Sequence, residues 1–149
     1  QLSNKLKKIM SSGHLVSDDI LNKIISEKLR NQKITEGFIL DGYPRTVAQS
    51  NYLLSFMSKN NLDFDLIIDF NINFKIVEER IIHRSKQENR SDDSLEIIKT
   101  RLEKYMQETH PVSEIFKRKF NKKSYILDAS QEISKIQKEL IEILKKVEN

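Results

Sequence analysis

The sequence predicts an α/β protein with three layers, α/β/α, around a central parallel sheet. Short apolar runs at residues 37–42, 65–70 and 125–127 have the length and flanking residues of buried strands. Longer segments with helical spacing of apolar residues separate these runs, and such crossovers give parallel pairing with helices on both faces. Because 149 residues suit one hydrophobic core, we expect a single domain over residues 1–149.

Two helices are predicted before the first strand. Apolar residues recur with helical spacing over residues 2–10, and Gly13 follows where a left-handed residue would end that helix. Ser17 is a favourable N-cap for the second helix, and Asp18 and Asp19 would lie in its first turn. Residues 20–29 supply its apolar stripe.

The remaining elements follow in alternation. Thr46 is a plausible N-cap for a helix that reaches residue 60, and Pro111 begins or interrupts a helix. Residues 85–94 are polar and lack periodicity, so we expect a connection there. The other predicted helices cover residues 74–87, 97–105 and 133–147.

Composition narrows the function classes. Lys and Arg outnumber Asp and Glu by 26 to 22, a net charge of +4 that suits anionic partners without the dense basic clusters typical of nucleic-acid binders. The chain has no cysteine, which excludes disulfides and thiolate metal sites. Its apolar runs are too short to span a bilayer. We therefore expect a cytoplasmic protein with no membrane and no nucleic-acid partner.

The segment GFILDGYPRTVAQS, residues 37–50, is the most informative stretch. In a parallel sheet, ligands bind beyond the carboxyl ends of the strands, where Asp41, Gly42 and Arg45 would lie. A guanidinium donates bidentately to phosphate, and a carboxylate can hold Mg²⁺ through water. The alternative from the residues alone is a tight turn with a surface arginine.

Residues 37–49 resemble the signature of the adenylate kinases, which convert ATP and AMP into two ADP. The resemblance implies a P-loop nucleoside monophosphate kinase-like fold. It also implies that Arg45 binds the AMP phosphate, Gly42 lets adenine approach the backbone, Gln49 contacts the adenine edge and Asp41 organises water on Mg²⁺. Pro44 would be cis. Kinases for UMP and CMP carry Asn at the position of Thr46 and Asp-Asn at positions 48 and 49, so AMP is favoured.

Residues 7–18 are similar to the family segment that lines the acceptor adenine. The resemblance places Met10, His14 and Val16 in the AMP site. It also implies that residues 1–35 form the helices that bind the nucleoside monophosphate. Without the resemblance, Met10 and Val16 would be interpreted as ordinary core residues.

Four arginines match the rest of the family pattern. Arg80 and Arg84 share one face of a predicted helix, while Arg90 and Arg101 lie before and on the next helix. Taken alone, each would be a solvated charge paired with a neighbour. The resemblance implies that Arg80 stacks on the ATP adenine and that Arg84, Arg90 and Arg101 clamp phosphates. Arg90 and Arg101 then also contact AMP, and the catalytic group comprises Asp41, Arg45, Arg84, Arg90 and Arg101.

The resemblance also implies a short lid at residues 85–93, without the zinc site of long lids, since the chain has no cysteine. Gln131 would contact ATP in the loop after the last strand. The family usually has glycine at the position of Ala129, which leaves the conformation of that loop open.

None of the 149 residues forms the phosphate loop Gly-x-x-x-x-Gly-Lys-[Ser/Thr]. We expect that loop and the first strand of the sheet upstream of Gln1, in a monomeric adenylate kinase that uses Mg²⁺ with ATP. These 149 residues alone would then be inactive. The alternatives are a UMP/CMP-type kinase and an inactive nucleotide-binding module.

Overall fold

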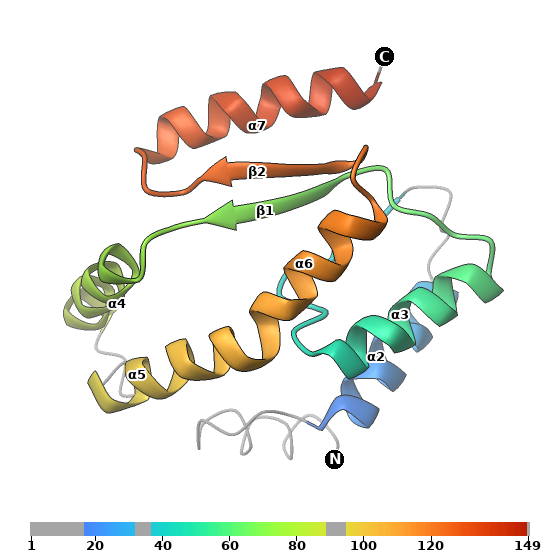
Figure 1. Cartoon of the computed structure of the whole chain (residues 1–149), viewed down its shortest axis with the longest axis horizontal. Coiled ribbons are helices and arrows are strands. Elements are labelled where there is room, and N and C mark those ends of the chain that lie inside the picture. Colours follow the sequence, from blue (N-terminus) through green and yellow to red (C-terminus); the bar gives the residue numbers. More distant parts are fainter. Residues whose placement is uncertain (1–16, 32–36, 89–94, 149) are drawn as a thin grey trace.

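The computed structural model describes residues 17–31, 37–88 and 95–148 (Figure 1). In chain order the elements are α2 (Asp18–Asn31), α3 (Val47–Lys59), β1 (Ile67–Asn71), α4 (Phe74–Glu88), α5 (Leu95–Lys104), the π-helical segment η2 (Tyr105–Thr109), α6 (His110–Lys119), β2 (Ser124–Asp128) and α7 (Ile133–Glu148). Most helices and the last two strands agree with the sequence prediction to within two residues. The helix predicted over residues 2–10 lies outside the described residues.

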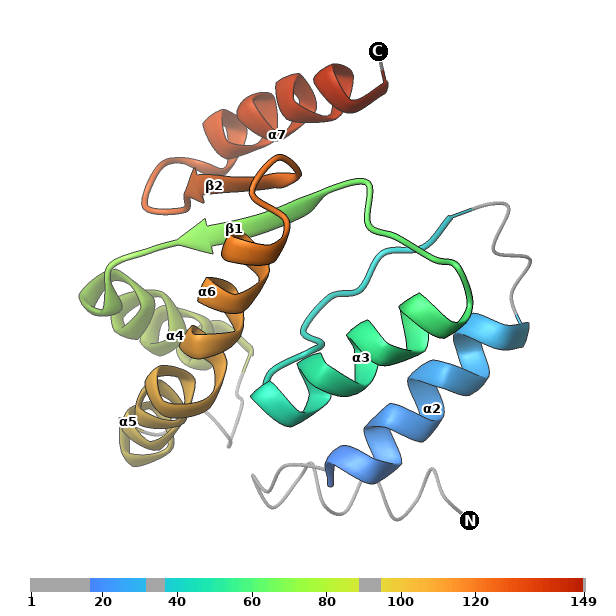
Figure 2. The same ribbon diagram turned by 45° about the vertical axis from the view of Figure 1, so that its right-hand side comes forward.

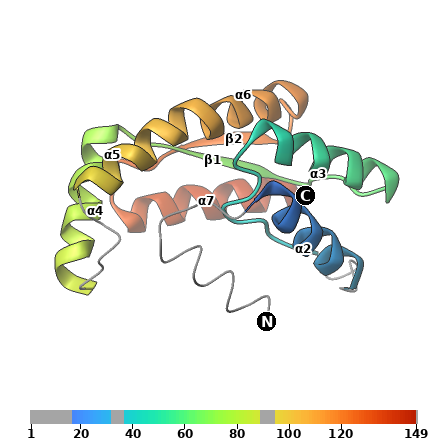
Figure 3. The same ribbon diagram turned by 90° about the horizontal axis from the view of Figure 1, so that it is seen from below.

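The sheet is parallel, as predicted. β1 and β2 pair with Ile67 opposite Ser124 and Asn71 opposite Asp128. Figure 3 shows α6 and α7 on opposite sides of these strands. On the α6 side, the Ser113 hydroxyl donates a hydrogen bond to the Asp69 carboxylate of β1. The three-layer α/β/α arrangement is therefore confirmed.

The strand predicted over residues 37–42 is not formed. In the described ranges the sheet consists of β1 and β2, and residues 37–40 belong to no helix or strand. Phe38 and Leu40 pack against the core, whereas the Ile39 side chain is 92% exposed. This alternation of packed and exposed side chains is the one expected of a strand. A strand also needs a hydrogen-bonded neighbour, and no described segment pairs with this one.

The main core lies where α2, α3 and α6 meet. Helices α2 and α3 lie side by side in both Figure 1 and Figure 2. Full burial of one aliphatic or aromatic side chain contributes about 1.5–3 kcal/mol, so this cluster fixes the helix pair against α6. Its buried members are Leu29 of α2, Leu53, Phe56 and Met57 of α3, and Val112 and Phe116 of α6.

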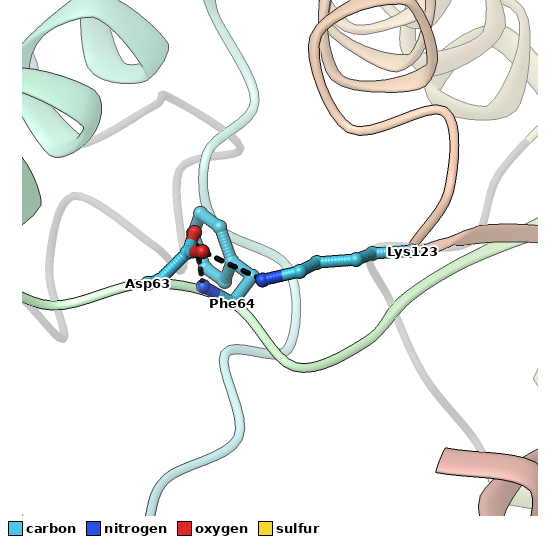
Figure 4. Close-up of polar contacts among 3 residues, drawn as sticks. All are labelled: Asp63, Phe64 and Lys123. Atoms are coloured by element: carbon cyan, nitrogen blue, oxygen red, sulfur yellow. Dashed lines mark hydrogen bonds and ion pairs between the residues drawn. The ribbon is translucent and has the colours of Figure 1, made fainter.

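A polar contact joins the loops that lead into the two strands (Figure 4). The Asp63 carboxylate accepts a hydrogen bond from the Phe64 N–H at 2.8 Å and from Lys123 Nζ at 2.6 Å. The bond from Lys123, more than the bond from Phe64, holds the pKa of Asp63 below its usual value. Because both charged side chains are well exposed, the ion pair itself contributes under about 1 kcal/mol. The Phe64 ring packs edge-on against Phe116 at 5.7 Å between centroids.

Helices α5 and α6 form one run through η2, which the sequence prediction treated as two helices near Pro111. The His110 N–H donates to the Tyr105 carbonyl, five residues earlier, which is π-helical spacing. Pro111 follows with no N–H of its own and stands in the first turn of α6. The wider π turn accommodates the proline where a regular α-helix would be interrupted.

Candidate functional site

The segment Asp41–Arg45 forms a tight turn at the edge of the core. Gly42 has a φ of +70°, and a Cβ built there would lie 2.8 Å from Arg45 Nη2. The left-handed backbone therefore favours glycine, and a Cβ at this position would also displace the exposed end of the Arg45 side chain. The Tyr43–Pro44 peptide bond is cis, as the resemblance implied.

Arg45 is held at three atoms. Its Nε donates to the Gly42 carbonyl at 2.8 Å, so the exposed guanidinium folds back over the turn. Its backbone N–H donates to Gln49 Oε1 at 2.7 Å. Its carbonyl accepts from the Thr109 hydroxyl of η2 at 2.9 Å. The turn and the π-helical segment are therefore joined at this arginine.

Gln49 is the buried member of a partly buried polar cluster between α2 and α3. Its Nε2 donates to Asp18 Oδ1 at 2.7 Å, while the Thr46 hydroxyl donates to Asp18 Oδ2 at 2.8 Å. Thr46 is the N-cap of α3, as predicted, and its hydroxyl accepts from the Gln49 N–H at 3.1 Å. Gln49 is 3% exposed, so its amide is committed to these partners in the structure.

The turn is also tied to α2 through Tyr43. Its hydroxyl donates to Asn22 Oδ1 at 2.5 Å, and Asn22 is buried. Burial of the phenol, together with the nearby Tyr52 and Asp18, raises the pKa of Tyr43 to about 12. The phenol therefore stays protonated and continues to donate at any physiological pH.

Asp41 is the one residue that the sequence proposed as a metal contact. Its carboxylate is exposed beside the turn. Among the residues that the structure describes, no three His, Asp or Glu side chains gather as a metal cluster. A lone exposed carboxylate fits Mg²⁺ held through water, because Mg²⁺ keeps several of its own water ligands.

A second group of predicted residues meets at the far edge of the sheet. Arg80 of α4 donates to the carbonyls of Ala129 at 2.7 Å, Ser130 at 3.4 Å and Gln131 at 3.3 Å. The structure therefore brings Arg80 and Gln131 together, although they are far apart in sequence. A cavity of about 450 Å³ beside them lies at the carboxyl ends of both strands, where α/β folds bind ligands.

The loop after β2 does not require a glycine at position 129. The Ala129 N–H donates to the Asn71 carbonyl at 2.8 Å, and its backbone is not left-handed. The Asp128 carboxylate accepts from the Ser130 hydroxyl and N–H, and these bonds lower the pKa of Asp128. An ordinary side chain is therefore tolerated where the family usually has glycine.

The other arginines lie on the helices that lead toward this region. Arg84 is one turn beyond Arg80 on α4, and Arg101 lies on α5, which contacts α4. Arg101 and Thr109 lie on one continuous helical run, and the Thr109 hydroxyl contacts the Arg45 carbonyl. This run therefore connects the helix of Arg101 to the Arg45 turn. Residues 85–88 of the expected lid continue α4. Met10, His14, Val16 and Arg90 lie outside the described residues.

Sequence reasoning missed four residues that hold this site. Asp18 was assigned to the first turn of a helix and to the end of the segment that is similar to the family's adenine-lining segment, but to no contact with Thr46 or Gln49. Asn22, Thr109 and Ser113 received no role. One signal was available for the first two: Asp18, Asn22 and Ser26 recur every fourth residue, which places a polar stripe along α2. Nothing in the sequence distinguished Thr109 or Ser113 from surface hydroxyls.

The parallel sheet, its covering helices and the arginine-bearing turn define an α/β fold of the P-loop nucleoside monophosphate kinase type. A model of the family described as adenylate kinase matches residues 1–121. The chain belongs to the adenylate kinase family.

Curated relatives agree with this assignment. The chain is 36% identical over 116 residues to an adenylate kinase of Stenotrophomonas maltophilia strain K279a, which covers 78% of this chain and 62% of the relative. It is 41% identical over 111 residues to an adenylate kinase of Xanthomonas oryzae pv. oryzae strain MAFF 311018, which covers 74% of this chain and 59% of the relative. The chain thus spans about 60% of the length of these relatives. Separately, no helix in the described part of the chain combines the length and apolarity needed to cross a membrane.

Proposed function

We propose that the protein containing this chain is an adenylate kinase, which reversibly transfers the γ-phosphoryl group of ATP to the phosphate of AMP. The bond between the γ-phosphorus and the β,γ-bridging oxygen breaks as an AMP phosphate oxygen attacks, giving two ADP. The observation that carries the proposal is the anchored Arg45 turn in a chain of this family. The chain, which spans about 60% of the length of its relatives, would supply the acceptor side and most arginines of the site.

On the acceptor side, Arg45 would bind the AMP phosphate. Both its backbone N–H and its backbone carbonyl form hydrogen bonds, so the backbone that carries the guanidinium is held in place. Within the described part of the chain the guanidinium donates through Nε to the Gly42 carbonyl, and its Nη atoms can form a bidentate contact with phosphate. Fixed donors of this kind stabilise an anionic transition state without reorganising during the reaction.

On the donor side, Arg80 and the loop after β2 would receive the ATP adenine. The bonds from Arg80 to the loop carbonyls run from the edge of the guanidinium, so its flat faces stay available for stacking on a base. Arg84, Arg90 and Arg101 would clamp the phosphates, because phosphoryl transfer depends on positioning and cationic stabilisation.

Asp41 would orient water ligands of Mg²⁺ at the turn. When bound with ATP, Mg²⁺ neutralises charge on the transferring phosphoryl group. The protein's own contribution is an exposed carboxylate next to Arg45, at the place where the two nucleotides would meet.

AMP is the proposed acceptor rather than UMP or CMP. Thr46 and Gln49 stand where the pyrimidine kinases carry asparagine, and both side chains are built into the cluster around Asp18. Asparagine is one methylene shorter than glutamine, so at position 49 it would not span the same contacts from the helix.

The test is Arg45→Ala in the full-length protein. We expect kcat/KM for AMP to fall about 100-fold, because a bidentate contact to phosphate contributes roughly 3 kcal/mol. The dissociation constant of ATP should change less than twofold. Arg118→Ala, which removes an exposed arginine from α6, is the matched control and should leave both unchanged.

Equal losses for ATP and AMP would contradict the assignment of Arg45 to the acceptor. Faster turnover with UMP or CMP than with AMP would favour the pyrimidine kinases. Nucleotide binding without ADP formation would favour the inactive module.

A further inference from the structure

We infer that Asp18 is a positioning residue that sets the place of Arg45 through the side chain of Gln49. The inference rests on the proposed function, since it concerns how the proposed AMP ligand is held. Three consecutive contacts carry it. Asp18 Oδ1 accepts from Gln49 Nε2 at 2.7 Å, Gln49 Oε1 accepts from the Arg45 N–H at 2.7 Å, and the Arg45 Nε donates to the Gly42 carbonyl at 2.8 Å.

The chemistry of the partners allows one orientation of the Gln49 amide. An ionised carboxylate only accepts hydrogen bonds, so Asp18 must meet the amide nitrogen. A backbone N–H only donates, so Arg45 must meet the amide oxygen. If the amide were turned over, its oxygen would face the Asp18 carboxylate, so that two acceptors would meet. Its nitrogen would face the Arg45 N–H, so that two donors would meet. Asp18 therefore determines which end of Gln49 faces the turn.

Burial makes this orientation firm. Gln49 is 3% exposed, so water cannot replace a lost partner at little cost. An unsatisfied buried polar group costs about 1–3 kcal/mol. Removing the Asp18 carboxylate would leave Gln49 Nε2 without its acceptor, and the amide would rearrange toward another one. The Arg45 N–H would then lose its fixed partner.

Asp18 also holds the start of α3. Its second oxygen accepts from the Thr46 hydroxyl at 2.8 Å, and that hydroxyl caps the helix by accepting from the Gln49 N–H at 3.1 Å. Both carboxylate oxygens thus contact the residues that follow Arg45. One side chain from α2 fixes the backbone on the carboxyl side of the proposed phosphate ligand.

Asp19 provides a matched comparison on the same helix turn. Both aspartates lie in the first turn of α2, where either one stabilises the helix dipole to a similar extent. Asp19 is exposed, whereas Asp18 is turned into the cluster. A variant of Asp19 therefore reports the loss of charge and of helix stabilisation without the loss of the Gln49 contact.

The experiment compares Asp18→Ala, Asp18→Asn and Asp19→Ala in the full-length protein, with KM for AMP, KM for ATP and the thermal midpoint as readouts. We expect Asp18→Ala to raise KM for AMP about tenfold while KM for ATP stays within twofold, because misplacing one donor affects only the phosphate it meets. Asp18→Asn should raise KM for AMP less than threefold, since the asparagine oxygen still accepts from Gln49. Asp19→Ala should leave both KM values unchanged.

A double variant separates positioning from general destabilisation. In a Gln49→Ala background, Asp18→Ala should raise KM for AMP far less than tenfold, because the contact that reaches the Arg45 N–H is already lost and only the contact of Asp18 with Thr46 remains to be removed. The inference is overturned if Asp18→Ala shifts KM for AMP no more than Asp19→Ala. Parallel rises in both KM values would also overturn it, as would an undiminished effect in the Gln49→Ala background.

The wild-type protein distinguishes a failure of the inference from a failure of the proposed function. If wild-type protein forms no ADP from ATP and AMP, the proposed function is wrong and the inference falls with it. If wild-type protein is active and the Asp18 variants match Asp19→Ala, only the inference is wrong. If Asp18→Ala does not fold, Asp18→Leu takes its place, because leucine fills a similar space and offers no acceptor to Gln49. An AMP to ATP ratio of KM values in Asp18→Leu equal to that in Asp19→Ala would then overturn the inference.

Discussion

Tyr43 shows how much of the site depends on single polar contacts. Its hydroxyl reaches across from the turn to α2, where Asn22 is buried. The folded protein holds the phenolic proton up to a pKa of about 12, whereas the ordinary value is 10.0. Between these values the unfolded chain has released the proton and the folded chain has not. The stability that this group contributes is therefore complete below pH 10 and is lost as the pH rises toward 12.

We predict that Tyr43→Phe removes the phenol that ionises near pH 12. Titration followed by the ultraviolet absorbance of tyrosinate checks this. Tyr43→Phe should also lower the free energy of unfolding by about 1–2 kcal/mol, because the side-chain oxygen of the buried Asn22 loses its hydrogen-bond donor. Tyr125→Phe, a change on β2 away from this interface, should leave the step near pH 12 in place. If that step survives in Tyr43→Phe, the phenol has been assigned wrongly.

At the scale of residues, the roles that could be predicted from the sequence are those that involve neighbours a few positions away. Thr46 was predicted as an N-cap, and it accepts from the Gln49 N–H three residues later. Gly42 has a left-handed φ that suits glycine, whereas the approach of adenine to its backbone, which the resemblance implies, stays a prediction. The polar stripe along α2 marks the face that carries Asp18, but its contacts with Thr46 and Gln49 could not be predicted, because these partners are 28 and 31 residues away and α2 must first pack against α3.

At the scale of elements, η2 gives the most specific prediction. Thr109 is the last residue of this π-helical segment, and its hydroxyl bonds to the Arg45 carbonyl. We predict that Thr109→Val, which keeps the shape and removes the hydroxyl, raises KM for AMP about threefold and that Thr109→Ser restores it. A net hydrogen bond of about 0.5–1.5 kcal/mol supports an effect of this size. Steady-state kinetics with AMP and ATP measure it.

Ser113→Ala is the control for that prediction. It lies one turn further along the same run and removes a hydroxyl that bonds to Asp69 rather than to Arg45. It should lower the thermal midpoint while leaving KM for AMP unchanged. If Ser113→Ala and Thr109→Val change KM for AMP equally, the contact with Arg45 is not the cause.

The elements also show where pattern reasoning stops. Strands β1 and β2 were predicted because each run is apolar, short and followed by polar residues, and each has a partner within the chain. Residues 37–42 carry the same pattern, but strand pairing is a property of two segments and cannot be inferred from one. The π turn before Pro111 could not be predicted either. A proline in a helical pattern predicts that the helix is interrupted, and not that a wider turn lets it continue.

At the scale of the whole molecule, the proposal makes the 149 residues incomplete as a catalyst. We predict that this chain alone forms no ADP from ATP and AMP, because its glycines at positions 13, 37 and 42 cannot build a phosphate loop. A coupled assay of ADP formation checks this, with the full-length protein as the positive control. ADP that appears only when both nucleotides are present with the 149-residue chain would show that the loop is dispensable.

The long run from α5 through η2 to α6 has a mechanical consequence. The Thr109 hydroxyl meets the acceptor turn and the Ser113 hydroxyl meets β1, so one helical turn of the run contacts both parts of the molecule. Its first half packs on α4, where the Ile98 side chain of α5 is fully buried and the Phe74 ring of α4 meets the Tyr105 ring edge-on at 6.0 Å between centroids. The run therefore braces α4 against the Arg45 turn. A displacement of α4, which carries Arg80 and Arg84, would reach the turn proposed to hold the acceptor phosphate through this brace.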